Sequence, residues 1–322
     1  MQRRFFLALS LFAALATGSV QAQQQAQQTP LRISYVRSPF NLQLMVMKEN
    51  GILQKHLTPL GLQAQWPEIT SGAKQAQALA SGDLDIGGVM NTASVLMANG
   101  EGNPVRIVAG VSRPTDVFAV VAGKNGVRKV ADLKGKTIAG PKGTVLHQLL
   151  VAALAREGIT MQQVNFVQMD IPQAFAAVQS GKVDAALLAA NFVLNAQKEG
   201  AHILARATGL VTPILVMTAS EKFLQTHPDR VKAVVAAHAE AWQWIQANKE
   251  DAIALGAKLQ NVSVEEARQL YNWSHFTQRL NNSDFRHMEK DMQFMLDNGM
   301  MRNRVNVRSI VTPGALNNPT AK

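Results

Sequence analysis

One pattern of hydrophobic and polar positions occurs twice along this chain, about a hundred residues apart. Residues 78–91 and 177–191 each begin with an alanine-rich helical pattern that stops at a Ser-Gly pair. Each continues through a charged residue, an apolar residue and an aspartate into a short apolar run that ends at Asn91 or Asn191. This order predicts a helix, a glycine at its C-terminal end and a buried strand. The repeat suggests two similar lobes, although a helix–glycine–strand unit is also common in α/β proteins in general.

The rest of the pattern alternates between strands and helices. Strands are predicted where apolar and polar positions alternate or short apolar runs occur, at residues 31–36, 62–66, 105–109, 116–121, 137–139, 164–169, 203–205 and 212–218. Helices are predicted from helical spacing and capping residues, at residues 42–49, 92–99, 145–157, 191–198, 228–247, 264–271 and 284–298. This alternation predicts α/β lobes, with residues 112–115 and 212–218 crossing between them.

The first 22 residues have the pattern of a signal peptide. Arg3 and Arg4 precede an apolar run over residues 5–16, and residues 20–22 provide the small side chains of a cleavage site. The two arginines are compatible with a Sec signal or a twin-arginine signal. Residues 23–30 are expected to form a disordered leader, and residues 315–322 a frayed tail. The signal predicts a periplasmic protein.

The composition excludes several kinds of chemistry. The chain has no cysteine, which excludes disulfides, a cysteine nucleophile and a thiolate metal site. Its formal charge of +10 falls to +8 (10 − 2) without Arg3 and Arg4, and such a surface attracts anionic ligands. The basic residues are scattered, so nucleic-acid binding is not expected. No histidine pair has metal-ligand spacing and no Gly-x-Ser-x-Gly motif occurs, so neither a metal, a cofactor nor a catalytic residue is predicted.

Polar residues at the starts of predicted helices are candidates for ligand binding. The helices that begin after Ser71 and Thr144 have free N–H groups in their first turns, which can bind an anion. His147 lies in the first turn after Thr144 and either contacts the ligand or is satisfied locally. Arg113, in the predicted crossing, either reaches an anion in the cleft or is a solvated loop residue.

Several segments together resemble the periplasmic substrate-binding proteins of ABC importers for sulfonates, taurine and nitrate, which are related to thiamin-pyrimidine binders. These segments are residues 71–72, 78–87, 131–139, 142–150 and 174–186. The resemblance implies a type II periplasmic binding protein fold, with two α/β lobes joined by two crossovers and a ligand cleft between them. Lobe one would comprise residues 31–113 and 213–322, and lobe two residues 114–212.

The resemblance also implies ligand-binding positions. The residues that match the family's ligand-binding positions are Ser38, Phe40, Ser71, Gly72, Asn91, Thr92, Gly143, Thr144 and Asn191. The pattern of this chain adds Met90, Arg113, His147 and Thr212 as candidates. Met90 and Phe192 would suit a ligand with an apolar part. The chain departs from the family's usual pattern at residues 89–92 and 190–192, which leaves the ligand open.

The predicted function is therefore non-catalytic binding. A monomer would capture a small, anionic organic molecule (a sulfonate, a taurine-like compound or a carboxylate) by lobe closure and deliver it to a permease in the inner membrane. The alternatives are a pyrimidine or nitrate binder of the same fold, an enzyme on this fold, and a sensor that presents its ligand to a membrane receptor. The absent cysteine argues against a pyrimidine synthase, because those relatives carry a cysteine-rich motif.

Overall fold

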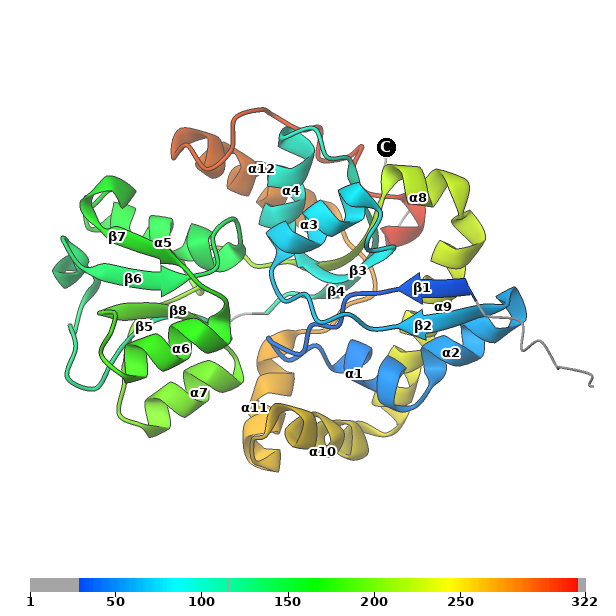
Figure 1. Ribbon diagram of the computed structural model, residues 1–322, viewed down its shortest axis with the longest axis horizontal. Helices are drawn as coiled ribbons and strands as arrows, with labels where there is room; N and C mark the ends of the chain where they lie inside the picture. Colours follow the sequence, from blue (N-terminus) through cyan, green and yellow to red (C-terminus); the bar gives the residue numbers. More distant parts are fainter. Residues whose placement is uncertain (1–28, 115, 318–322) are drawn as a thin grey trace, which may run out of the picture.

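The computed structural model of the protein describes residues 29–114 and 116–317, which form two α/β lobes (Figure 1). The predicted signal peptide and most of the predicted leader lie outside the described residues, as do residues 318–322. Lobe one contains the strands β1 (Thr29–Arg32), β2 (Leu62–Gln65), β3 (Ile86–Asn91), β4 (Val105–Ser112) and β10 (Leu215–Ser220). Lobe two contains β5 (Phe118–Ala122), β6 (Thr137–Gly140), β7 (Asn165–Gln168), β8 (Ala185–Ala189) and β9 (His202–Arg206).

The two lobes share one strand order. In lobe two the order is β7-β6-β8-β5-β9, and β5 is antiparallel to both of its neighbours. In lobe one, β1 pairs with β2, and β3-β10-β4 form a ladder in which β10 is antiparallel to both neighbours. A parallel bridge between Ile33 and Ile86 joins these two parts into the order β2-β1-β3-β10-β4. The common topology confirms the two similar lobes that the repeated pattern suggests.

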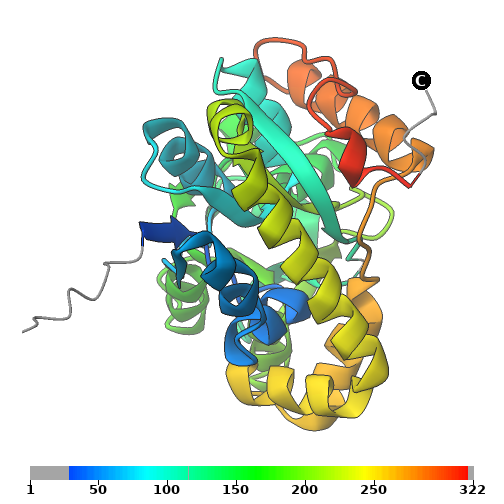
Figure 2. The same ribbon diagram turned by 90° about the vertical axis from the view of Figure 1, so that its right-hand side faces the viewer.

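Helices cover both sheets. Lobe two carries α5 (Val145–Arg156), α6 (Ile171–Gln179) and α7 (Asn191–Lys198). Lobe one carries α1 (Leu42–Glu49), α2 (Ile52–Leu57), α3 (Gly72–Ser81), α4 (Thr92–Gly100), α8 (Glu221–Thr226), α9 (Pro228–Ala247), α10 (Lys249–Gln260), α11 (Val264–Ser274) and α12 (Asn282–Asp297). Short 3₁₀ turns cover residues 58–60, 130–133, 161–163 and 313–315. Figure 2 shows α9 crossing the side of lobe one, where it packs on α1 and α2.

The repeated unit has the predicted local structure in both lobes. Helix α3 stops at Gly82 before β3, and α6 ends just before Gly181, which precedes β8. Gly82 has a φ of 81° and Gly181 a φ of 71°, a left-handed conformation that glycine adopts without the clash of a Cβ atom. All residues of β3 and β8 are buried. One hydrophobic cluster contains residues of both lobes, so the lobes are packed against each other.

Several predicted boundaries are wrong. The first strand was expected over residues 31–36, but its ladder ends at Arg32 and only isolated bridges continue it at Ile33 and Tyr35. The second crossing strand begins at Leu215 rather than residue 212, because Pro213 has no N–H to donate to a ladder. The expected frayed tail is ordered at its start. The N–H of Leu280 donates to the carbonyl of Ala315 at 2.8 Å, so this segment packs on the lobe.

Helix α2 was not predicted, and α8 and α10 lie in the part of the chain that was expected to be helical but were not predicted as separate elements. Helices α2 and α8 have six residues each, too few to give a clear periodic pattern. Helix α10 follows α9 with only Asn248 between them, whose φ of −130° and ψ of 51° break the helix.

Candidate ligand-binding site

A small cavity with a volume of about 50 Å³ lies between the two lobes. Lobe one lines it with Val36, Ser38, Pro39, Thr70, Gly72, Val89, Met90, Asn91 and Leu215, and lobe two with Phe118, Pro141, Thr144, Val145, Leu146 and Ile171. Most of this lining is apolar, and the polar side chains carry hydroxyl or amide groups. No charged side chain is among the lining residues that the structure describes.

Four helices begin at this cavity, two from each lobe. Gly72 and Ile171 are the first residues of α3 and α6, while Asn91 and Thr144 are the N-caps of α4 and α5. The first turn of a helix has N–H groups without intrahelical partners and carries a partial positive charge. Four such ends around one cavity create an environment that favours a negative charge without any lysine or arginine.

The N-cap side chains hold these helix ends in place. The Oδ1 atom of Asn91 accepts a hydrogen bond from the N–H of Ser94 at 2.9 Å. The Oγ1 atom of Thr144 accepts from the N–H of His147 at 3.5 Å, and its hydroxyl donates to the carbonyl of Pro141 at 2.8 Å. Ser71 caps α3 in the same way. Each cap satisfies one of the free N–H groups, and at α4 the N–H of Thr92 also donates to the carbonyl of Ile214, so only the remaining first-turn N–H groups are available to a ligand.

Gly72 permits a close approach of α3 to α4. A Cβ atom at this position would lie 2.6 Å from Oγ and 2.8 Å from Cβ of Ser94. The hydroxyl of Ser94 donates to the carbonyl of Gly143 at 2.7 Å, which links lobe one to lobe two. The glycine of the Ser-Gly pair is therefore needed for the packing beside the cavity.

The loop after β1 contributes an unpaired polar atom. Ser38 lines the cavity, and its Oγ is buried without a hydrogen-bond partner among the described residues. A buried hydroxyl without a partner is costly, so a ligand atom that bonds to it gains affinity. Phe40 has a different place, because its ring is 1% exposed and packs against Gly256 of α10. We assign Phe40 to the core of lobe one rather than to the ligand.

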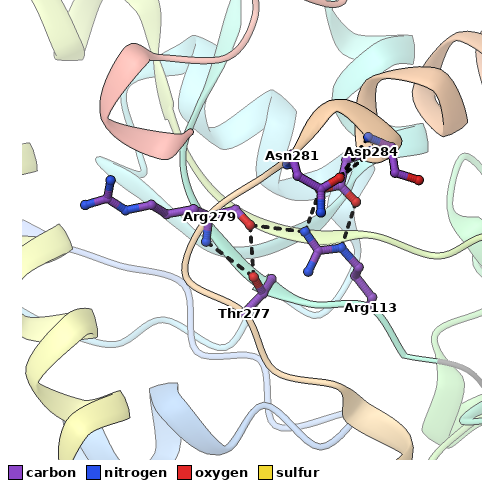
Figure 3. Close-up of polar contacts among 6 residues, drawn as sticks. Arg113, Thr277, Arg279, Asn281 and Asp284 are labelled. Carbon is purple, nitrogen blue, oxygen red and sulfur yellow. Dashed lines mark hydrogen bonds and ion pairs between the residues drawn. The ribbon is translucent and has the colours of Figure 1, made fainter. Parts of the chain in front are cut away.

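Arg113 is bound to the start of α12 (Figure 3). Its Nε donates to Oδ1 of Asp284 at 2.7 Å, its second guanidinium nitrogen to Oδ2 at 2.5 Å, and the same nitrogen to the carbonyl of Arg279 at 3.1 Å. Asp284 is 1% exposed and also accepts from the N–H of Asn281 at 2.8 Å. This arrangement corrects the expectation that the guanidinium reaches an anion in the cleft, because a buried carboxylate already holds it.

His147 lies behind the cavity lining. It is 8% exposed, and its ring centroid is 5.1 Å from that of Phe166. Burial, and to a lesser degree the nearby Lys142, lowers the pKa of His147 from 6.5 to about 4. The imidazole is therefore neutral at neutral pH and adds no positive charge to the site.

Asn191 points toward lobe one. Its Nδ2 donates to the carbonyl of Gln260 at 3.5 Å, and its Oδ1 is buried without a partner among the described residues. The preceding residue, Ala190, has a φ of 48°, a conformation that costs about 1–3 kcal/mol for a residue with a Cβ and persists only where the surroundings impose it. Asn191 thus lies at the contact between the lobes and does not line the cavity.

Five of the predicted residues come together at the cavity, namely Ser38, Gly72, Met90, Asn91 and Thr144. The others lie near it or elsewhere: Phe40, Ser71, Thr92, Arg113, Gly143, His147, Asn191 and Thr212. Thr92 is 2% exposed and its N–H donates to the carbonyl of Ile214. Thr212 lines a separate cavity of about 190 Å³ beside α12.

Sequence reasoning missed most of the apolar lining. Thr70 directly precedes the Ser-Gly pair and could have been included on that ground, and Ile171 begins α6, the helix of the second copy of the repeated pattern. Phe118, Pro141 and Leu215 have no distinguishing signal, because a buried apolar residue at a strand end resembles any core residue. Within residues 29–114 and 116–317, no group of three or more His, Asp or Glu side chains could hold a metal ion, and no helix could cross a membrane.

The sequence of this chain is similar to one protein family and to named relatives in it. A family model described as NMT1/THI5 like matches residues 60–252. The taurine-binding periplasmic protein of Escherichia coli (strain K12) is 30% identical over 252 residues, which cover 75% of this chain and 73% of that protein.

Solved structures share the fold at lower identity. The alkanesulfonate-binding protein SsuA from Xanthomonas axonopodis pv. citri, bound to MOPS, superposes with a TM-score of 0.77 at 22% identity, covering 88% of this chain and 98% of that one. The desulfurization enzyme DszB superposes with a TM-score of 0.64 at 17% identity, covering 90% and 98%. The fold is therefore one that both binding proteins and an enzyme use, and the choice between them depends on the site.

Proposed function

The chain belongs to the NMT1/THI5-like family, and from this premise we propose that it is the periplasmic substrate-binding component of an ABC importer. Its ligand is a small organic anion of the sulfonate, taurine or carboxylate type. The observation that carries this proposal is the convergence of four helix N-termini, two from each lobe, on one cavity. Relatives named for taurine and alkanesulfonate binding support the ligand class.

Binding replaces the hydration shell of the anion. Free N–H groups of α3, α4, α5 and α6, together with the hydroxyl of Ser38, donate to the anionic oxygens. No carboxylate lines the cavity among the described residues, so nothing there repels a negative charge. The apolar lining, which includes Met90 and Phe118, contacts the carbon part of the ligand.

Lobe closure couples binding to transport. Three polar contacts connect the lobes, namely Ser94 to Gly143, Lys74 to Asp170 and Lys198 to Glu266. The closed volume of about 50 Å³ holds only a few heavy atoms, so a larger ligand holds the lobes further apart. Opening at the inner-membrane permease then releases the ligand. We place the protein in the periplasm as a monomer.

The lining supports binding rather than catalysis. A general acid–base mechanism needs a side chain that titrates near the working pH, within hydrogen-bond reach of the reacting atom. The lining side chains of the described residues include no histidine, carboxylate or lysine, and the hydroxyls of Ser38 and Thr144 have no neighbouring base in the lining.

A ligand screen tests the proposal. The mature protein is heated with taurine, alkanesulfonates, nitrate, aromatic carboxylates and pyrimidines in turn. A ligand at 100 times its dissociation constant stabilises the folded state by about 2.7 kcal/mol, which raises the melting temperature. We expect a sulfonate or carboxylate to do so, and Ser38→Ala and Thr144→Ala to weaken its affinity, measured by calorimetry. A screen in which no anion raises the melting temperature contradicts the proposal, and a response to pyrimidines alone moves the ligand to another class.

A further inference from the structure

A second and larger cavity, of about 550 Å³, lies in lobe one at the opposite end of the sheet from the proposed ligand site. It is lined by the start of β1, the turn after α3, the start of β4, helix α8 and the first turn of α9. In Figure 1 these elements lie on the right, away from lobe two. The proposed ligand site is at the C-terminal ends of β1 and β3, so the two cavities are separate.

One wall of this cavity is apolar. Leu79, Leu84 and Val105 line it and are each at most 2% exposed, and Phe223 of α8 is half-buried beside them. These side chains belong to the core of the lobe, which fixes the shape of the wall. A fixed apolar wall in a cavity of this size is typical of ligand sites, which occupy about 300–1,000 Å³.

The lining also carries positive charge. Lys222 and Arg230 line the cavity, and neither forms an ion pair with a carboxylate in the described part of the chain. Asp85 is the only described carboxylate in the lining, and Arg32 neutralises it through bonds of 2.8 and 3.1 Å. The lysine, arginine and aspartate side chains of the lining carry a formal net charge of +2 (3 − 1), from Arg32, Lys222, Arg230 and Asp85.

We propose that this cavity binds a second ligand, a free organic carboxylate with an apolar chain. The apolar wall accommodates the chain, and Lys222 and Arg230 bind the carboxylate. A neutral apolar molecule would leave the two cations without a partner, and a small inorganic anion would leave the apolar wall in water. The site is independent of the ligand cavity between the lobes.

Calorimetric titration with dodecanoate, below its micelle concentration, tests this site. The mature protein is expected to bind one equivalent. The double variant Lys222→Glu/Arg230→Glu is expected to bind at least tenfold more weakly, because it reverses both charges. Lys232→Glu/Lys258→Glu is the matched control, since both lysines are exposed, lie outside the cavity and change the net charge by the same amount. This control is expected to keep the affinity of the unmodified protein.

Four results overturn the site, three of them in the dodecanoate titration. The first is no binding of millimolar dodecanoate to the unmodified protein, and the second is equal weakening in the two double variants. The third is loss of dodecanoate binding in Thr144→Ala, which would place the carboxylate between the lobes. A second experiment measures whether the protein sediments with vesicles of phosphatidylglycerol. Sedimentation with vesicles without binding of free dodecanoate would mean a membrane-contacting surface, and this too contradicts the proposal. Circular dichroism and the melting temperature establish that each variant is folded.

Discussion

At the residue scale, the most unusual side chain is His238 in the middle of α9. It is 1% exposed, and both ring nitrogens are buried without a partner among the described residues. Burial lowers its pKa from 6.5 to about 4, so the folded state holds it neutral. The unfolded chain binds a proton at this position throughout the range between those two pKa values, whereas the folded protein does not.

We therefore predict that the protein loses stability as the pH falls from 6.5 toward 4. Because the unfolded state binds more protons, each such histidine lowers the free energy of unfolding by up to about 1.4 kcal/mol per pH unit in this window. His147 contributes in the same direction, and Asp291 opposes it, since burial raises its pKa to about 6. Urea denaturation of the unmodified protein and of His238→Met, at pH 4.5, 5.5 and 6.5, measures the effect. An equal pH slope in both proteins would contradict the assignment to His238.

At this scale, the sequence predicts the element in which a residue lies better than it predicts which other residue its side chain contacts. The sequence places Arg113 in a crossing segment, which is correct, but its partner Asp284 is 171 positions further along the chain. No local pattern specifies a contact at that separation. Phe40 follows the first strand as the family pattern implies, yet its ring is buried against Gly256 of α10. Both placements depend on tertiary contacts that short-range periodicity does not encode.

At the scale of elements, helix ends organise the candidate site. The bounds of α9, which begins at Pro228, were predicted without error, and so were those of α7, although no side chain caps that helix. The capping box of Ser263 and Glu266 was also predicted correctly. Strand ends were less predictable, because their pairing depends on neighbours distant in sequence. The helix starts at Ser71 and Thr144 could be predicted from the sequence, whereas their meeting at one cavity depends on how the lobes pack.

Gly72→Ala tests the contact between α3 and α4. The new Cβ would lie 2.6 Å from Oγ and 2.8 Å from Cβ of Ser94, so one of the two helix starts must shift. We expect a loss of about 1–3 kcal/mol in the free energy of unfolding from overpacking, together with weaker ligand binding. Gly314→Ala is the control, because a Cβ there meets nothing within 4 Å and the backbone is not left-handed. Chemical denaturation and calorimetry give the two quantities. A Gly72→Ala protein as stable and as tight-binding as the control would show that this contact is unimportant.

At the scale of the whole molecule, two ion pairs connect the lobes. Lys74 of α3 pairs with Asp170 at the start of α6 at 2.8 Å, and Lys198 of α7 pairs with Glu266 of α11 at 2.6 Å. Together they hold lobe one to lobe two in the closed arrangement. Because both pairs are partly exposed, each should contribute only about 0.2–1 kcal/mol and should weaken as salt screens the charges.

Removing both pairs should shift the equilibrium toward open lobes. In Lys74→Ala/Lys198→Ala we expect a larger radius of gyration by small-angle X-ray scattering and a ligand affinity several-fold weaker, since closure contributes less to binding. Added salt should change the affinity of this variant less than that of the unmodified protein. Lys55→Ala/Arg268→Ala is the matched control, because it also removes two charges and the pairs of these residues with Glu240 and Glu250 lie within lobe one. If the control opened the molecule as much as the double variant does, the effect would come from general charge loss rather than from the two contacts. If neither protein opened, the packed hydrophobic residues between the lobes would be sufficient to hold them closed.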